Sequence, residues 1–201
     1  MELIVDGQTV YIATGNKELK PELPSVLFIH GAGQDHTIWV LPTRYFVRHQ
    51  RNVLAVDLPG HGRSGGEPLQ RIEMIAQWLI QVLDATGIDS AAVVGHSMGS
   101  LVALAMAAKY AERVRVIGLV AVGVPMPVSE LLLSSAKQNS PDAIDMLTLW
   151  GHGSPAHLGG SATPGMWMLG CGRRLLEHAA PGVIYAGLNA CNEYLQGLSD
   201  A

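Results

Sequence analysis

Four short runs of the chain are apolar at almost every position and end in glycine, aspartate, histidine or proline. A strand that is apolar throughout is buried on both faces, which is typical of a parallel sheet covered by helices. Helical segments fall between the runs, and this order predicts right-handed crossovers in a doubly wound α/β sheet. The four predicted strands are residues 25–29, 52–56, 91–94 and 116–124.

The helical signal is clearest in residues 68–86, where apolar side chains recur at the spacing of one helix face. Pro68 suits the first turn of this helix and Gly87 suits its end. Residues 98–110 predict a second helix, rich in alanine, and residues 43–49 a shorter one. These helices would cover the predicted sheet.

The N-terminal residues predict a β-hairpin that precedes the parallel strands. Residues 3–5 and 9–12 are rich in strand-forming side chains and flank Asp6-Gly7, a pair that favours a tight hairpin turn. We therefore expect two antiparallel strands at the start of the fold.

The pentapeptide Gly95-His96-Ser97-Met98-Gly99 lies between a predicted buried strand and a predicted helix. This context is the one in which Gly-x-Ser-x-Gly forms a sharp turn that exposes a nucleophilic serine. Glycine is needed at both ends because side chains there would collide. The start of the following helix also favours negative charge near its amides. We expect Ser97 to be a nucleophile and the Met98 amide to stabilise an oxyanion.

A second glycine-rich turn, His30-Gly31-Ala32-Gly33, follows the first predicted parallel strand. Acyl transfer needs two amide donors, and the second comes from such a turn. Ala32 is the expected donor, with Gly33 as the second choice. Where a serine lies in such a turn, the acid and the catalytic histidine follow it in the chain. His30 precedes Ser97, so we expect it to have a structural role rather than that of the base.

The segment from Asp57 to Ser64, Asp-Leu-Pro-Gly-His-Gly-Arg-Ser, follows the second parallel strand. Asp57 and His61 could suggest two members of a triad. We expect instead that Asp57 and Arg63 hold this loop by hydrogen bonds and an ion pair.

These three motifs, in this order, resemble the α/β-hydrolase superfamily over residues 1–125. The resemblance implies an α/β-hydrolase core in residues 1–125 and a helical cap or lid in residues 126–201. Because residue 97 is serine, it points to esterase, lipase, C–C hydrolase or perhydrolase-like members, whereas the related haloalkane dehalogenases and epoxide hydrolases have aspartate there.

After Val124 the strand pattern stops. Residues 129–137, 141–150, 166–178 and 182–198 predict helices, and residues 151–165 a loop rich in glycine, serine and proline. Gly31, Gly33, Trp150 and Trp167 are expected to contact substrate, the two tryptophans as part of an apolar roof most of whose residues are expected to be cap core.

Family members have an acid after a further strand and a histidine after the last strand, and neither strand is predicted here. His152, His157 and His178 all lie in the expected cap, so no acid or base is assigned. We expect these two groups to lie outside this chain and the chain alone to be weakly active or inactive. The expected last strand, Val116–Val124, would leave an open edge that pairs with another copy or with a complementary segment.

Composition limits the remaining classes of function. The net charge is -4 and no basic run occurs, so we expect no nucleic-acid partner. We also expect no membrane span, no metal and no cofactor. The two cysteines form no disulfide or metal motif, which indicates a cytoplasmic protein. Charged residues make up only 15% of the chain, which fits a surface that is partly covered.

Together, these features predict a serine hydrolase that acts on a small carbonyl substrate. The alternatives are a non-catalytic ligand-binding or partner-binding module of the same fold, or a perhydrolase or C–C hydrolase.

Overall fold

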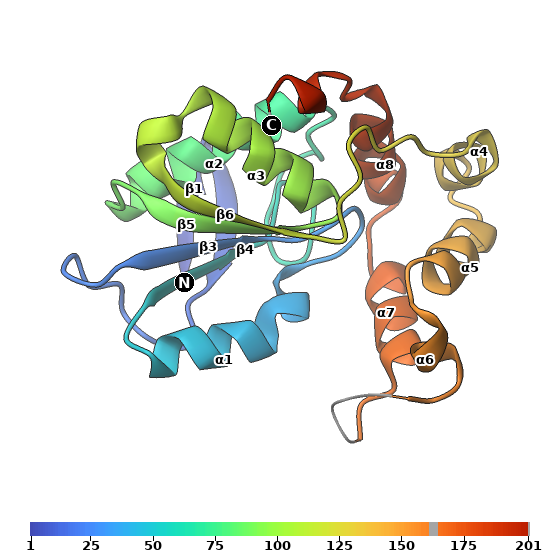
Figure 1. Ribbon diagram of the computed structural model, residues 1–201, viewed down its shortest axis with the longest axis horizontal. Coiled ribbons are helices and arrows are strands. Elements are labelled where there is room, and N and C mark those ends of the chain that lie inside the picture. The colour runs from blue at the N-terminus through green and yellow to red at the C-terminus, as the bar shows by residue number, and fades with distance from the viewer. Residues whose placement is uncertain (161–164, 201) are drawn as a thin grey trace.

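A six-stranded sheet with the strand order β1-β2-β4-β3-β5-β6 forms the centre of the protein (Figure 1). The computed structural model describes residues 1–160 and 165–200. The strands are β1 (Glu2–Val5), β2 (Gln8–Ala13), β3 (Ser25–Ile29), β4 (Asn52–Val56), β5 (Ala91–His96) and β6 (Val114–Val120).

The first two strands form the predicted hairpin. β1 pairs antiparallel with β2, with Val5 opposite Gln8. Asp6 and Gly7 have positive φ angles of 49° and 74°, as a two-residue hairpin turn requires. β2 then pairs antiparallel with β4 and joins the hairpin to the parallel strands.

The other four strands are parallel, as the apolar runs predict. β3 pairs with β4 on one side and with β5 on the other, and β5 pairs with β6. Every residue of β3 and β4 is buried. The predicted strands 25–29 and 52–56 are therefore confirmed to the residue.

Helices cover both faces of this sheet (Figure 1). On one face, η1 (His36–Trp39) and α1 (Val40–Arg48) pack on alternate side chains of β3, and the Phe28 ring lies 4.8 Å from that of Trp39. On the other face, α2 (Ile72–Thr86) and α3 (Met98–Lys109) bury Leu27 in the largest apolar cluster. This is the predicted doubly wound α/β arrangement.

The prediction that α2 begins at Pro68 is wrong. The helix starts at Ile72, and Arg71 before it is extended. Pro68 packs instead on the loop after β4, where a Cβ atom on Gly60 would lie 2.9 Å from the Pro68 nitrogen. The predicted end is confirmed, because Gly87 caps the helix with a φ of 69°.

The predicted bounds of the last strand, 116–124, are also wrong. β6 spans Val114–Val120, and its last residue pairs with His96, the last residue of β5. Ala121 then adopts a φ of 54°, which takes the chain out of the sheet. After the short helix η2 (Ala111–Arg113), β6 thus begins earlier and ends earlier than its apolar run.

A helical segment follows β6 and lies to one side of the sheet (Figure 1). It contains no strand within residues 126–160 and 165–200. A short helix forms at 154–157, where a loop is predicted, and residues 161–164 of that predicted loop lie outside the described part. The helices are α4 (Glu130–Lys137), α5 (Pro141–Trp150), α6 (Ser154–His157), α7 (Met168–Glu177), α8 (Val183–Glu193) and η3 (Gln196–Leu198).

The last long helix, α8, joins this segment to the core. Its residues Ala190 and Cys191, with Tyr194 just after it, are buried in the same apolar cluster as α2 and α3. Leu188 belongs to a second cluster, formed with α4 and α5. In the described residues, no helix has the length and apolar character needed to cross a membrane.

Candidate active site

Ser97 occupies the sharp turn between β5 and α3. Its φ and ψ angles are 52° and -118°. A non-glycine residue in such a sparsely populated region costs about 1–3 kcal/mol, so the surroundings must hold it in place. Ser97 is half-buried and forms the N-cap of α3. The strained turn that the pentapeptide predicts is therefore present.

Two glycines allow the backbone to pack closely around this serine. A Cβ atom on Gly99 would lie 2.3 Å from the Ile29 carbonyl oxygen, so α3 starts in contact with the end of β3. A Cβ atom on Gly95 would lie 2.0 Å from the Gly99 carbonyl oxygen and 2.4 Å from the Ser100 nitrogen. Any side chain at position 95 or 99 would force these elements apart.

Ser100 fixes the turn to the neighbouring strand. Its fully buried hydroxyl donates to the Gly95 carbonyl at 2.7 Å and accepts from the Val120 amide at 3.0 Å. The Ser97 amide donates to the Val120 carbonyl at 2.9 Å. The end of β6 thus holds both the strand side and the helix side of the turn.

The glycine-rich turn after β3 lies against Ser97. A Cβ atom on Gly31 would be 3.3 Å from the Ser97 Cβ. Ala32 and Met98 lie together beneath Gly187 of α8, where an added Cβ would be 2.6 Å from the Ala32 Cβ and 3.1 Å from the Met98 Sδ. Within residues 1–160 and 165–200, neither the Ala32 amide nor the Met98 amide donates a hydrogen bond.

The other predicted contact residues are placed differently from one another. Gly33 has a φ of 68° and packs against α8, where a Cβ atom would lie 2.6 Å from Ile184. Trp150 and Trp167 lie in the helical segment and are 62% and 70% exposed. Most of the surface of each residue therefore faces solvent, and neither residue belongs to the buried core.

His30 is a fully buried connector between two loops, in agreement with the structural role expected for it. Its Nδ1 lies 2.9 Å from the Gly31 carbonyl, and its Nε2 accepts the Leu58 amide at 3.1 Å. Burial lowers the pKa of His30 to about 3, and the neighbouring His61 contributes to this. A ring with both nitrogens engaged is not available as a base.

His61 packs against His30, with ring centroids 4.8 Å apart. Its Nδ1 bonds the Pro59 carbonyl at 2.9 Å, whereas its buried Nε2 has no partner among the described residues. Burial lowers the pKa of His61 as well. Both imidazoles are therefore kept neutral.

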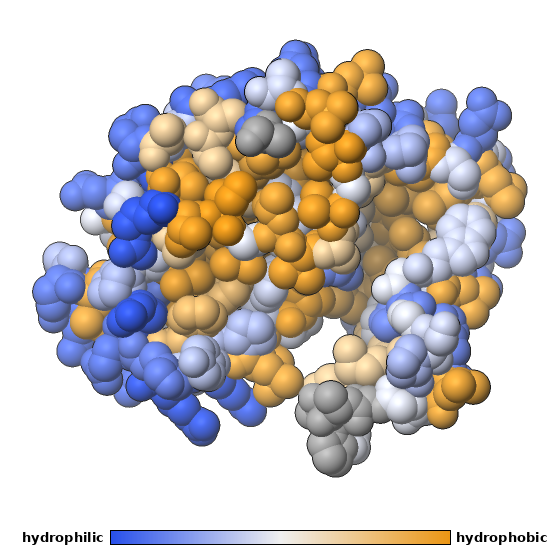
Figure 2. All heavy atoms as spheres, viewed as in Figure 1, coloured by the Kyte–Doolittle hydropathy of each residue, from blue (hydrophilic) through white to orange (hydrophobic). Residues whose placement is uncertain are grey.

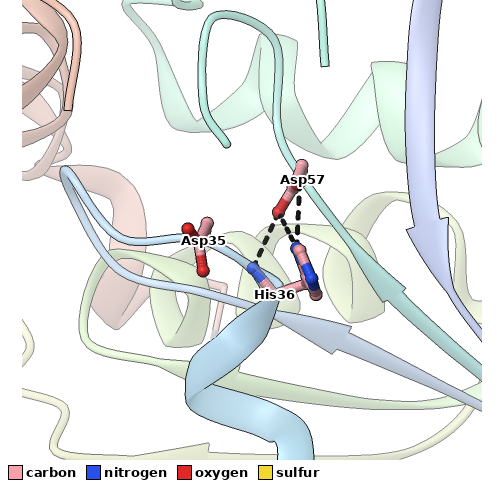
Figure 3. Close-up of side chains that lie close together, drawn as sticks. All are labelled: Asp35, His36 and Asp57. Atoms are coloured by element: carbon pink, nitrogen blue, oxygen red, sulfur yellow. Dashed lines mark hydrogen bonds and ion pairs between the residues drawn. The ribbon is translucent and has the colours of Figure 1, made fainter. Parts of the chain in front are cut away.

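Asp57, directly after β4, binds His36 at the start of η1, and Asp35 lies nearby (Figure 3). The Asp57 carboxylate is fully buried and accepts from the His36 amide at 2.7 Å and from the His36 Nδ1 at 2.8 Å. Asp35 accepts from the amide and hydroxyl of Thr37. These oxygens already act as hydrogen-bond acceptors that hold the loops.

The predicted ion pair between Asp57 and Arg63 is wrong. The Arg63 backbone amide donates to Asp57 at 2.9 Å, so the expected hydrogen bonding is present. The guanidinium instead pairs with Glu2 at 3.0 Å and lies 3.8 Å above the centroid of the Tyr11 ring. Arg63 therefore ties the loop to the N-terminal hairpin.

Gln34 and His96 are two site residues that sequence reasoning missed. The Gln34 Oε1 accepts the Gly31 amide at 3.0 Å and lies 3.0 Å from the His96 Nδ1. Burial lowers the pKa of His96, and His152 from the helical segment lowers it further. The only signal in the sequence was their position, directly beside the two motifs that surround Ser97.

Comparison with known proteins agrees with this architecture. A family model described as alpha/beta hydrolase fold matches residues 24–156, which is more than half of the chain. The enol-lactonase from Burkholderia xenovorans LB400 superimposes with a TM-score of 0.78 at 21% identity, covering 96% of this chain and 74% of the lactonase. At that identity the likeness shows the fold alone.

Two curated relatives are similar in sequence. The dihydrolipoyllysine-residue acetyltransferase component of the acetoin cleaving system of Cupriavidus necator is 39% identical over 48% of this chain. The 2-hydroxy-6-oxononadienedioate/2-hydroxy-6-oxononatrienedioate hydrolase of Burkholderia vietnamiensis is 34% identical over 64% of this chain. The chain spans only 26% and 46% of the length of these two proteins.

Proposed function

The chain belongs to the α/β-hydrolase family, and from this premise we propose that it carries the nucleophile and oxyanion hole of a serine hydrolase acting on a small carbonyl substrate. Ser97 attacks the carbonyl carbon, and the amides of Met98 and Ala32 hold the negative charge that develops on the oxygen. The strained backbone of Ser97, opposite the glycine-rich turn, is the observation that carries this proposal.

The two amides support the assignment because they are unused. A buried amide without an acceptor lowers the stability of the folded protein by about 1–3 kcal/mol, so such groups are rarely left unpaired without a reason. Ala32 is half-buried and Met98 is buried, and neither amide has an acceptor in the described part of the chain. A substrate oxygen bound between them would satisfy both.

We propose that the base and the acid come from residues outside this sequence. His30 and His61, which lie after β3 and β4, are buried and engaged in holding loops. Without an imidazole the serine hydroxyl attacks poorly, although an oxyanion hole alone can retain about 10³–10⁴-fold catalysis. The chain by itself should therefore turn over substrate weakly or not at all, while Ser97 still reacts slowly with an excess of a reactive probe.

A fluorophosphonate probe tests the nucleophile. Excess probe should slowly add one label to the wild-type chain, located at Ser97 by peptide mass spectrometry. The Ser97→Ala variant should not be labelled, whereas Ser140→Ala, which changes the half-buried N-cap of α5, should be labelled as wild type. Equal labelling of Ser97→Ala, or no label on wild type, would favour the non-catalytic binding module.

A second candidate is hydrolysis of a carbon–carbon bond in a substrate of the 2-hydroxy-6-oxodienoate class. The Burkholderia vietnamiensis hydrolase supports it, because that relative aligns over 64% of this chain. Consumption of 2-hydroxy-6-oxononadienedioate is measured by the loss of its absorbance. This assay separates carbon–carbon bond hydrolysis from activity on a simple ester. Activity that requires peroxide would instead support a perhydrolase.

We also propose that the helical segment, residues 126–201, is the cap. Leu176 of α7 and Ile184 of α8 pack on Gly33, so this segment borders the glycine-rich turn. Beneath the proposed cap, Gly31 and Gly33 of the core contact substrate from below, and Trp150 and Trp167 approach it only if the segment moves. Crosslinking of a photoreactive ester to these residues would test the assignment.

The free edge of β6 supports a proposal about association. Within the described residues, β6 pairs only with β5, and Val116 is 61% exposed. Figure 2 shows apolar side chains gathered over β6. We propose that in the purified chain this edge pairs with a second copy. Light scattering should give a dimer that Val116→Lys converts to a monomer; a wild-type monomer contradicts the proposal.

We also propose that the protein is located in the cytoplasm. Cys171 and Cys191 are both free thiols, one exposed and one buried, as is usual where disulfides do not form. Fractionation of cells that express the protein would test it.

A further inference from the structure

The Gln34 side chain bridges the two backbone turns that meet at Ser97. Its Oε1 accepts the Gly31 amide at 3.0 Å and lies 3.0 Å from the Nδ1 of His96, the last residue of β5. The Gln34 amide also donates to the Gly31 carbonyl at 3.2 Å. One residue thus closes the glycine-rich turn and ties it to the residue before the nucleophile.

The bridge determines which His96 nitrogen carries a proton. A backbone amide can only donate, so the Gln34 atom that faces Gly31 must be the oxygen. That same oxygen faces the His96 Nδ1, and because it can only accept, Nδ1 must be protonated. The neutral His96 imidazole therefore has its acceptor nitrogen at Nε2.

The bridge also occupies one amide of the glycine-rich turn. The Gly31 backbone lies against the serine, with an added Cβ only 3.3 Å from the Ser97 Cβ, yet its amide is bound to Gln34. The next amide, that of Ala32, has no acceptor in residues 1–160 and 165–200. Gln34 therefore takes the Gly31 amide out of use as an oxyanion donor.

We propose that Gln34 is a positioning residue for the oxyanion hole: its side-chain oxygen holds residues 31–34 against the nucleophile turn and leaves the Ala32 amide, rather than that of Gly31, for the substrate. This inference rests on the proposed function, because it assigns a role to Gln34 in the same site. A glutamine that merely fills space would need neither hydrogen bond.

Two variants of Gln34 separate these possibilities. Gln34→Met keeps the length of the side chain and removes the acceptor. Gln34→Glu keeps an acceptor for both donors and places a carboxylate beside the His96 Nδ1. The matched control is Gln138→Met, at an exposed glutamine that ends α4.

The first measurement is the pKa of His96, determined by an NMR titration of the full chain. In Gln34→Glu it should rise by about one pH unit or more, because an opposite charge within hydrogen-bond distance favours the protonated ring. An unchanged His96 titration in this variant would overturn the bridge, and with it the positioning role.

The second measurement is the rate at which the fluorophosphonate probe labels Ser97. Gln34→Met should be labelled at least about tenfold more slowly, since removing one oxyanion donor costs about 10²–10³ in rate. Gln34→Glu should be labelled faster than Gln34→Met, and Gln138→Met at the wild-type rate. Equal rates for wild type and folded Gln34→Met would overturn the positioning role.

Unfolding curves show whether each variant is folded. If Gln34→Met does not fold, Gln34→Asn replaces it, because its amide is one methylene too short to reach both partners. If wild-type Ser97 is not labelled at all, the proposed function fails and the positioning role fails with it, while the His96 titration still decides whether the bridge exists.

Discussion

Gly95 and Gly99 approach so closely that a Cβ atom on residue 95 would lie 2.0 Å from the Gly99 carbonyl oxygen. Real Cβ atoms do not come that near to backbone, so β5 and α3 can meet at Ser97 only if residue 95 has no side chain. The close approach therefore links the stability of the core to the geometry of the candidate nucleophile.

Gly95→Ala should destabilise the protein severely. The added methyl meets backbone, which cannot move aside as a flexible side chain can, so a loss above about 4 kcal/mol is expected. Gly153→Ala is the control, because its nearest neighbour would be 3.7 Å away, and it should change stability by less than about 0.5 kcal/mol. Chemical denaturation measures both, and similar stabilities would contradict the geometry.

Ser100→Ala should destabilise the fold by about 1–3 kcal/mol. The Ser100 hydroxyl is buried and serves the Gly95 carbonyl and the Val120 amide, and removing it leaves both backbone groups without that partner. Ser134→Ala, at an exposed position on α4, is the matched control. The measurement is the difference in urea midpoint between the two variants. Equal midpoints would mean that the hydrogen bonds of the Ser100 hydroxyl contribute nothing to stability.

Asp57→Asn should cost more stability than Glu2→Gln. The Asp57 carboxylate is fully buried and accepts from three donors, on His36 and Arg63, whereas an amide would turn donors toward some of them. Losing such buried charged hydrogen bonds costs about 1.5–3 kcal/mol. Glu2→Gln breaks an exposed ion pair with Arg63, worth at most about 1 kcal/mol. Thermal unfolding ranks the two, and the reverse order would be evidence against Asp57 as the loop anchor.

Stability should fall as the pH falls below about 6.5. Burial lowers the pKa of His30 to about 3 and also lowers that of His61, so the folded state binds fewer protons there than the unfolded state. The stabilisation is complete above the unfolded pKa of about 6.5 and is lost progressively toward the folded pKa. At pH 5, His30 alone should cost about 2 kcal/mol relative to pH 7.5.

The variant His61→Phe isolates one part of this effect. It removes a ring whose Nε2 has no partner among the described residues, and with it one proton that only the unfolded state binds. Urea unfolding at pH 7.5 and pH 5 should show a smaller drop in stability for this variant than for wild type. An equal or larger drop would mean that His61 is not kept neutral by the fold.

Local pattern alone determined strands β3 and β4, the hairpin and the nucleophile turn. Residues 25–29 and 52–56 are apolar throughout, and only burial on both faces satisfies such a strand. Asp6-Gly7 specifies its turn through positive φ angles, and Gly95 and Gly99 specify theirs through missing side chains. In each case the physical requirement lies within a few consecutive residues, so the sequence carries it.

The tertiary structure decided which distant residues became partners. Arg63 pairs with Glu2 rather than Asp57, β6 ends where β5 ends, and Pro68 packs on the loop at Gly60 instead of starting a helix. The contact between Gln34 and His96 joins residues 62 positions apart. Such contacts depend on which elements the sheet order brings together, because a hydrogen bond or ion pair is made only by groups that the whole fold places within about 3 Å of each other.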